Sequence, residues 1–231
     1  RHLIDGAQQP VILHWLGEMF DPALSGYWGS RDVAAASDFV LGGVTCLGLL
    51  PKECSGDHVI FWLHGGGFSM GSPKSHKGLA TQTAAAARAS TVIPDYRLAP
   101  EARHPAAVED CAAAYRGMLN EGVKAANVVM AGDSAGGGLA LMTLLRLKEE
   151  GAPLPSGLML LSPWVNFANS GWSFDAKAQR DPLLTRDGLN RRAAGYFGEA
   201  WDKAQEFKIL ESDLRGLPPG DLVIKTIDGL N

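Results

Sequence analysis

The sequence has few cysteines, no long uncharged apolar run and no histidine beyond position 104. Its three cysteines (Cys46, Cys54 and Cys111) are odd in number and widely spaced, which fits neither a zinc site nor a disulfide framework. We therefore expect a reducing, cytoplasmic location and no metal site. No stretch approaches about 18 apolar residues, and no basic segment precedes a long apolar run near the N-terminus. We expect neither membrane insertion nor a signal peptide.

Charge and composition narrow the class of protein further. The net charge is −4 and no basic stripe is present, so nucleic acid is not an expected partner. A hydrophobic content of 46% and a charged content of 20% are ordinary for a soluble globular protein. A chain of 231 residues is well matched to one α/β domain.

From residue 58 onward, short apolar runs alternate with helix-like stretches. We predict buried strands at 59–63, 91–93, 128–131, 158–161 and 222–224, and helices at 76–89, 106–119 and 137–150. Gly42-Gly43 predicts a hairpin within 38–50. This alternation is typical of an α/β fold with a mostly parallel central sheet and helices on both faces.

Two segments depart from that alternation. Residues 1–30 read as a helix followed by a loop, and 164–205 carry Trp164, Trp172 and Trp201 with little strand character. We divide the chain into an N-terminal segment, 1–30, and a core, 31–231, in which 164–205 is a helical insertion over the sheet. The three tryptophans fit either internal packing or the lining of a ligand pocket.

A nucleophile motif follows the predicted strand 128–131. Gly132-Asp133-Ser134-Ala135-Gly136-Gly137 has the form G-x-S-x-G, with an apolar strand before it and a long helix after it. A sharp turn between strand and helix exposes a serine hydroxyl for attack on an acyl carbon. The alternative is a glycine- and serine-rich turn without chemistry, but the flanking elements favour Ser134 as a nucleophile.

A glycine loop follows the predicted strand 59–63. His64-Gly65-Gly66-Gly67-Phe68 lets the backbone approach a developing oxyanion, and each lost N–H donor costs about 2.7–4 kcal/mol. We predict donors at Gly66, Gly67 and Ala135, with His64 as a residue that orients the loop. A phosphate loop is the alternative, but Lys74 does not stand where that motif needs its lysine.

Charged residues near these motifs are expected to be structural. Asp95, Arg97, Glu101 and Asp110 form a cluster that is more consistent with mutual pairing than with catalysis. Asp133 adjoins the nucleophile, but neighbouring side chains on a sharp turn point apart, so we expect a structural role for it.

Further motifs give the chain a family resemblance. Asp95-Tyr-Arg-Leu-Ala-Pro-Glu101, Ser162-Pro163-Trp164 and Asp181-Pro182-Leu183 accompany the elbow and the glycine loop. Over about residues 56 to 219 the chain resembles hormone-sensitive-lipase-like carboxylesterases (bacterial family IV) of the α/β-hydrolase superfamily. The resemblance implies a cap built from the N-terminus and 164–205. It also implies hydrolysis of short-chain acyl esters through an acyl-enzyme on Ser134, without a cofactor; a homodimer is left open.

The rest of the triad does not follow the family pattern. The triad order is serine, acid, histidine, yet all six histidines precede Ser134. Asp228 is the candidate acid, one residue later than expected after Leu217-Pro218-Pro219, and Asp221 is less suited because it precedes the predicted strand. His104 could substitute as a base only from the wrong side of the nucleophile. We predict that the chain is incomplete at its C-terminus by roughly 60–90 residues.

A second function class stays open. The same fold could serve as a non-catalytic binding module for a small molecule, as in plant gibberellin receptors, which resemble this family and lack a working base. The intact elbow and glycine loop favour the enzyme, because a receptor needs no oxyanion hole.

Overall fold

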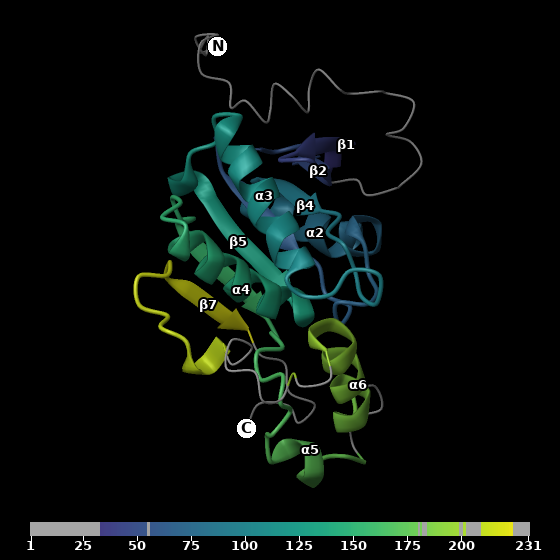
Figure 1. Ribbon diagram of the computed structural model, residues 1–231. Helices are drawn as coiled ribbons and strands as arrows, with labels where there is room; N and C mark the ends of the chain where they lie inside the picture. Colours follow the sequence, from purple (N-terminus) through teal and green to yellow (C-terminus); the bar gives the residue numbers. More distant parts are fainter. Residues whose placement is uncertain are drawn as a thin grey trace, which may run out of the picture.

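The computed structural model describes residues 33–54, 56–179, 181, 184–198, 201 and 209–223. These residues form a seven-stranded sheet with helices on both faces (Figure 1). The strands are β1 (Val33–Leu41), β2 (Val44–Pro51), β3 (Val59–Leu63), β4 (Ser90–Pro94), β5 (Val128–Asp133), β6 (Gly157–Leu161) and β7 (Gly220–Val223).

The sheet has the order β1-β2-β4-β3-β5-β6-β7. β1 and β2 form an antiparallel hairpin, as predicted, and its turn uses Gly42 and Gly43 with φ of 55° and 86°. Two residues with positive φ match the turn that the twist of a two-residue hairpin prefers. β2 pairs antiparallel with β4, and all later pairings are parallel. The predicted mostly parallel sheet is confirmed.

Three long helices cover the sheet: α2 (Pro73–Ala87), α3 (Ala106–Asn120) and α4 (Ala135–Glu149). Successive strand side chains point to opposite faces, so one strand supplies two cores. Phe61 of β3 packs into the core under α3 and α4, whereas Ile60 and Trp62 pack into a smaller core with Ala80 of α2. Both faces are therefore covered, which explains why β3 is a continuous apolar run and why every residue of β3 and β4 is buried.

Between β6 and β7 the described residues form helices and no strand. α5 (Ser173–Ala176) and α6 (Arg186–Phe197) lie at the end of the molecule to which the arrowhead of β7 points (Figure 1). Short 3-10 turns occur at η2 (Ala125–Asn127) and η4 (Ile209–Glu211). β7 begins at Gly220, two residues earlier than predicted, so Asp221 lies within the strand and not before it. The predicted segment 1–30 lies outside the described residues.

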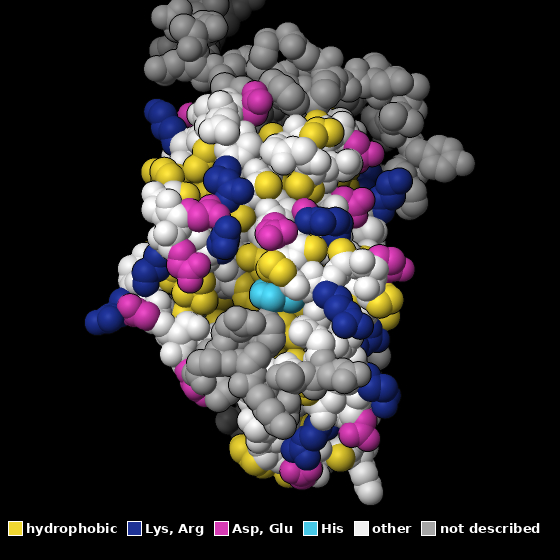
Figure 2. All heavy atoms as spheres, viewed as in Figure 1, with side chains coloured by type: hydrophobic (Ala, Val, Ile, Leu, Met, Phe, Trp, Pro, Cys, Tyr) yellow, Lys and Arg dark blue, Asp and Glu magenta, His cyan; other side chains and the backbone are white. Residues whose placement is uncertain are grey.

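The described surface carries no concentration of one charge on the face drawn in Figure 2, where Lys and Arg side chains are interspersed with Asp and Glu. None of the helices built from described residues is long and apolar enough to cross a membrane.

Two glycines within helices allow a matched test of the packing. A Cβ on Gly117 of α3 would overlap the backbone nitrogen of Gly42, whereas a Cβ on Gly78 of α2 would meet nothing within 4 Å. We predict that Gly117→Ala destabilises the fold by roughly 1–3 kcal/mol through overpacking. Gly78→Ala should stabilise it by about 0.5–1 kcal/mol through helix propensity. Urea unfolding measures both, and shifts of the same sign would contradict the observed packing of α3 on the hairpin.

Candidate active site

Ser134 occupies a strained turn between β5 and α4. Its φ of 52° and ψ of −121° are unusual for a residue with a side chain, and such strain is held only when neighbours fix the backbone. Ser134 N donates to Leu161 O at 3.0 Å, and Trp164 N donates to Ser134 O at 2.7 Å. The end of β6 and the loop that follows it therefore bind the backbone on both sides of the serine.

Small residues let the elbow close. A Cβ on Gly132 would overlap the backbone of Gly136, and a Cβ on Gly136 would overlap the carbonyl oxygen of Leu63. The first turn of α4 consequently lies directly against the end of β3, from which the glycine loop departs. This contact explains why the G-x-S-x-G pattern needs glycine at both of its outer positions here.

The glycine loop has three successive residues in left-handed backbone conformations. Gly66, Gly67 and Phe68 have φ of 125°, 63° and 60°. A Cβ on Gly66 would overlap the carbonyl oxygen of Met70, so the loop tolerates no side chain there. Gly66 O accepts hydrogen bonds from Ser69 N at 3.3 Å and Met70 N at 3.1 Å, which closes the loop into a compact turn.

The Asp133 carboxylate joins the two motifs. Its Oδ1 accepts hydrogen bonds from Gly65 N at 3.1 Å and from Trp62 Nε1 at 3.2 Å. Its Oδ2 lies 3.3 Å from His76 Nε2 in α2. The residue before the nucleophile thus holds the first glycine of the loop, which agrees with the structural role expected for Asp133.

The ion pair with His76 changes the acidity of both partners. Burial alone would raise the pKa of Asp133, but the hydrogen bond and charge of His76, with the bonds from Trp62 and Gly65, hold that pKa below its ordinary value. The hydrogen bond to Asp133 raises the pKa of His76 above 6.5, against the opposing effect of burial. Each partner therefore favours the charged form of the other.

His64 is held as a neutral ring inside the protein. Burial lowers the pKa of His64 to about 4. Its Nδ1 lies 2.8 Å from Gly65 O, and its ring stacks on Tyr96 with 4.2 Å between centroids. Tyr96 also donates its hydroxyl to His64 O at 2.6 Å. This geometry is that of a residue that orients the loop.

Helix α6 lies on the glycine loop. Arg192 Nη1 donates to Ser69 Oγ at 2.8 Å, and a Cβ on Gly67 would meet the Arg192 side chain. Phe68 is fully buried and stacks on Tyr196, with centroids 4.1 Å apart and rings 9° from parallel. Between the loop and α6 is a hollow of about 270 Å³, lined by Ser69, Ala99, Pro100, Gly188, Arg191, Arg192 and Gly195.

Two of the four residues in the predicted charged cluster, Arg97 and Asp110, pair with each other. Arg97 donates from Nε and Nη2 to Asp110 at distances from 2.8 to 3.1 Å, and its backbone N–H binds the same carboxylate. Glu109 lies 3.8 Å from the Arg97 guanidinium, although the sequence did not single it out. The pairing of Arg97 with Asp110 agrees with the structural role expected of the cluster.

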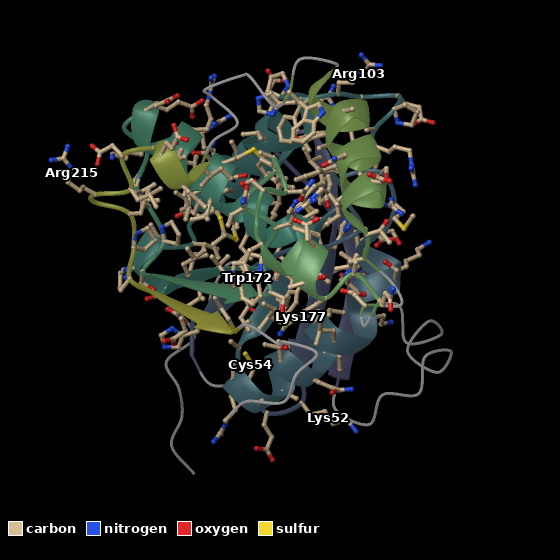
Figure 3. The ribbon with its side chains drawn as sticks, turned by 90° about the horizontal axis from the view of Figure 1, so that it is seen from below. Lys52, Cys54, Arg103, Trp172, Lys177 and Arg215 are labelled. Atoms are coloured by element: carbon tan, nitrogen blue, oxygen red, sulfur yellow. The ribbon has the colours of Figure 1, made fainter. Side chains whose placement is uncertain are left out.

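The three tryptophans have different environments. Trp164 packs 5.7 Å from the Phe68 ring, and Trp201 packs against the main core. Trp172, beside α5 in Figure 3, is 73% exposed. Internal packing therefore accounts for two of them, and Trp172 lies on the surface.

The contacts of the described histidines are structural, and none of these histidines has a contact with Ser134 that would mark it as the triad base. His64 and His76 hold the glycine loop, and the His104 ring packs 5.7 Å from Tyr196 and 5.4 Å from Phe197 in α6. His58 is exposed just before β3. Asp228, the candidate acid, lies outside the described residues.

Sequence reasoning missed four residues that shape the site: Trp62, His76, Tyr96 and Arg192. Tyr96 belongs to the quoted Asp95–Glu101 motif, which is a signal that could have marked it. The other three lie in an apolar strand and two helices. Trp62 and His76 contact Asp133 across 71 and 57 residues, and Arg192 contacts Ser69 across 123 residues. No local pattern carries that information.

Comparison with known proteins places this geometry in a family. The α/β hydrolase fold family matches residues 60–231, and a family of proteins of unknown function matches residues 1–45. An acetyl-hydrolase from Streptomyces hygroscopicus is 36% identical over 192 residues, covering 83% of this chain and 64% of the relative. An esterase from Acinetobacter venetianus is 33% identical, covering 74% and 56%. The chain thus spans less than two thirds of these relatives.

Comparison with solved structures supports the same family. A crystal structure of an esterase from the bacterial hormone-sensitive lipase family superposes with a TM-score of 0.82 at 35% identity, covering 89% of this chain and 69% of the esterase. A hormone-sensitive lipase from a metagenome library superposes with a TM-score of 0.79 at 40% identity, covering 87% and 69%. The chain belongs to the α/β-hydrolase fold family, in its hormone-sensitive-lipase-like branch.

Proposed function

We propose that this chain carries the nucleophile and the oxyanion hole of a carboxylic ester hydrolase. The observation that carries the proposal is the hydrogen bond from Gly65 N to the Asp133 carboxylate, 3.1 Å long. It ties the glycine loop to the residue that immediately precedes Ser134. The hydrogen bond holds the glycine loop next to the turn that carries Ser134. Acyl transfer requires the nucleophile and the oxyanion donors to be close together in this way.

In the proposed reaction, Ser134 Oγ attacks the acyl carbon of an ester and its proton passes to a general base. The carbonyl oxygen becomes an oxyanion that accepts hydrogen bonds from Gly66, Gly67 and Ala135 N–H groups. The tetrahedral intermediate then expels the alcohol, which takes up the proton, and leaves an acyl-enzyme on Ser134. Water repeats the same attack on the acyl-enzyme and releases the carboxylic acid.

We assign no residue of this chain as the general base. The described histidines are occupied by the loop or by α6, or lie before β3. Because the chain covers 64% of the acetyl-hydrolase relative, the activity proposed is that of the whole protein. Asp228 remains the candidate acid on the strength of its position in the sequence alone.

We infer that α6, together with α5, which is joined to it by the ion pair between Arg186 and Asp175, belongs to a cap over this site. Two contacts support the inference: Arg192 lies on Gly67 and Ser69, and Tyr196 stacks on Phe68. A helix fixed on the oxyanion loop in this way limits the room for the substrate's acyl or alcohol part. Small esters are therefore the proposed substrates, a view that the acetyl-hydrolase relative also favours.

Replacement of the nucleophile tests the reaction. Ser134→Ala should lower the rate of p-nitrophenyl acetate hydrolysis by at least about 10³-fold in the full-length protein, because the acyl-enzyme can no longer form. It should also abolish labelling by a fluorophosphonate probe. Ser170→Ala is the matched control, since Ser170 is exposed and should leave both readouts unchanged. Full-rate turnover by Ser134→Ala would exclude Ser134 as the nucleophile.

A chain-length series tests the substrate class. Rates with p-nitrophenyl acetate and butyrate should exceed those with long-chain acyl esters, because α6 lies directly on the loop and restricts the site. Steady-state kcat/KM across the series measures this preference. An optimum with long-chain triglyceride emulsions would contradict the proposed class.

A further inference from the structure

His76 lies beside the glycine loop but has no part in the proposed triad. It stands in the first turn of α2, where Ser72 and Ser75 form a reciprocal capping arrangement. The Ser75 hydroxyl donates to Ser72 O at 2.9 Å and accepts from Ser72 N at 2.9 Å. Ser75 Oγ also lies 2.9 Å from His76 Nδ1, so with its hydrogen directed to Ser72 O it accepts from a protonated Nδ1. The capping arrangement thus favours the tautomer with the proton on Nδ1.

The other ring nitrogen faces two groups. His76 Nε2 lies 3.2 Å from Gly65 N and 3.3 Å from Asp133 Oδ2. When Nε2 is unprotonated it accepts from the Gly65 N–H. When it is protonated it donates to Asp133 Oδ2, and the Gly65 N–H keeps only Asp133 Oδ1, at 3.1 Å, as its acceptor.

We propose that His76 is a positioning residue for the glycine loop. Whether Nε2 carries a proton decides whether the Gly65 N–H binds His76 or Asp133 alone. The inference rests on the proposed function of that loop. Gly65 is held on its other side by His64 Nδ1, which lies 2.8 Å from Gly65 O. The carbonyl of Gly65 and the N–H of Gly66 share one peptide plane. A change at Gly65 therefore reorients an oxyanion donor.

The charges around His76 set the direction of this response. Asp133 raises the pKa of His76 above 6.5, and the Asp133 carboxylate itself stays ionised because its pKa is lowered. His64, 5.3 Å away between ring centroids, is neutral at these pH values because burial lowers its pKa to about 4. His76 therefore keeps its second ring proton to a higher pH than an ordinary imidazole does, and it loses that proton as pH rises through its raised pKa.

The test is a pH titration of the ¹⁵N-labelled full-length protein by NMR, between about pH 5 and pH 9. The Gly65 amide and the Trp62 indole, which both bind Asp133 Oδ1, should titrate with the midpoint of the His76 ring protons, above 6.5. In His76→Gln both signals should lose their pH dependence. His58→Gln removes an exposed histidine and should leave both titrations unchanged.

A Gly65 amide that is independent of pH in the wild-type protein would overturn the proposal, whether or not His76→Gln folds. The same holds if the titration persists in His76→Gln. These spectra do not depend on turnover. They can therefore refute the role of His76 even if the protein hydrolyses esters, and they can support it even if the proposed hydrolysis is not observed. Where hydrolysis is measurable, His76→Gln should lower kcat by roughly tenfold to a hundredfold with little change in KM, because the donors serve the transition state.

Discussion

The site depends on one partly buried carboxylate, that of Asp133. Asp133 accepts hydrogen bonds from β3 through Trp62 and from the glycine loop through Gly65, and it pairs with His76 of α2. It precedes Ser134, so the strand that presents the nucleophile also sets the position of the loop. If one member of this cluster is removed, the remaining polar groups lose a hydrogen-bond or ion-pair partner while they stay partly shielded from water. A cluster with missing partners would therefore destabilise the protein more than apolar side chains at the same positions would.

Strained backbone is the second constraint. Ser134 and Phe68 both have positive φ, which a residue with a side chain adopts only when its surroundings enforce it. Leu161 at the end of β6 and Trp164 in the following loop bind the two backbone polar groups of Ser134, and Tyr196 of α6 stacks on the ring of Phe68. These contacts stabilise the two turns whose N–H groups are proposed to face an oxyanion.

The sequence predicts the elements whose signal is local. Strand 59–63 is found at the expected bounds, and the hairpin turns at Gly42 and Gly43, because apolar runs and glycine pairs are short-range patterns. The bounds of β7 could not be predicted as well, since its register is set by pairing with β6. The elbow and the loop were visible as motifs, but the link through His76 arises only when α2 packs on the sheet and brings His76 to Asp133 at the end of β5.

The central claim is that a bound acyl oxygen would rest on N–H groups of Gly66, Gly67 and Ala135 while the acyl group is attached to Ser134. The most direct measurement is a crystal structure of the full-length protein after reaction with a phosphonate ester. The account predicts a covalent bond to Ser134 Oγ, with one phosphonyl oxygen about 2.7–3.1 Å from those nitrogens. An unmodified Ser134, or a phosphonyl oxygen turned away from the glycine loop, would contradict it.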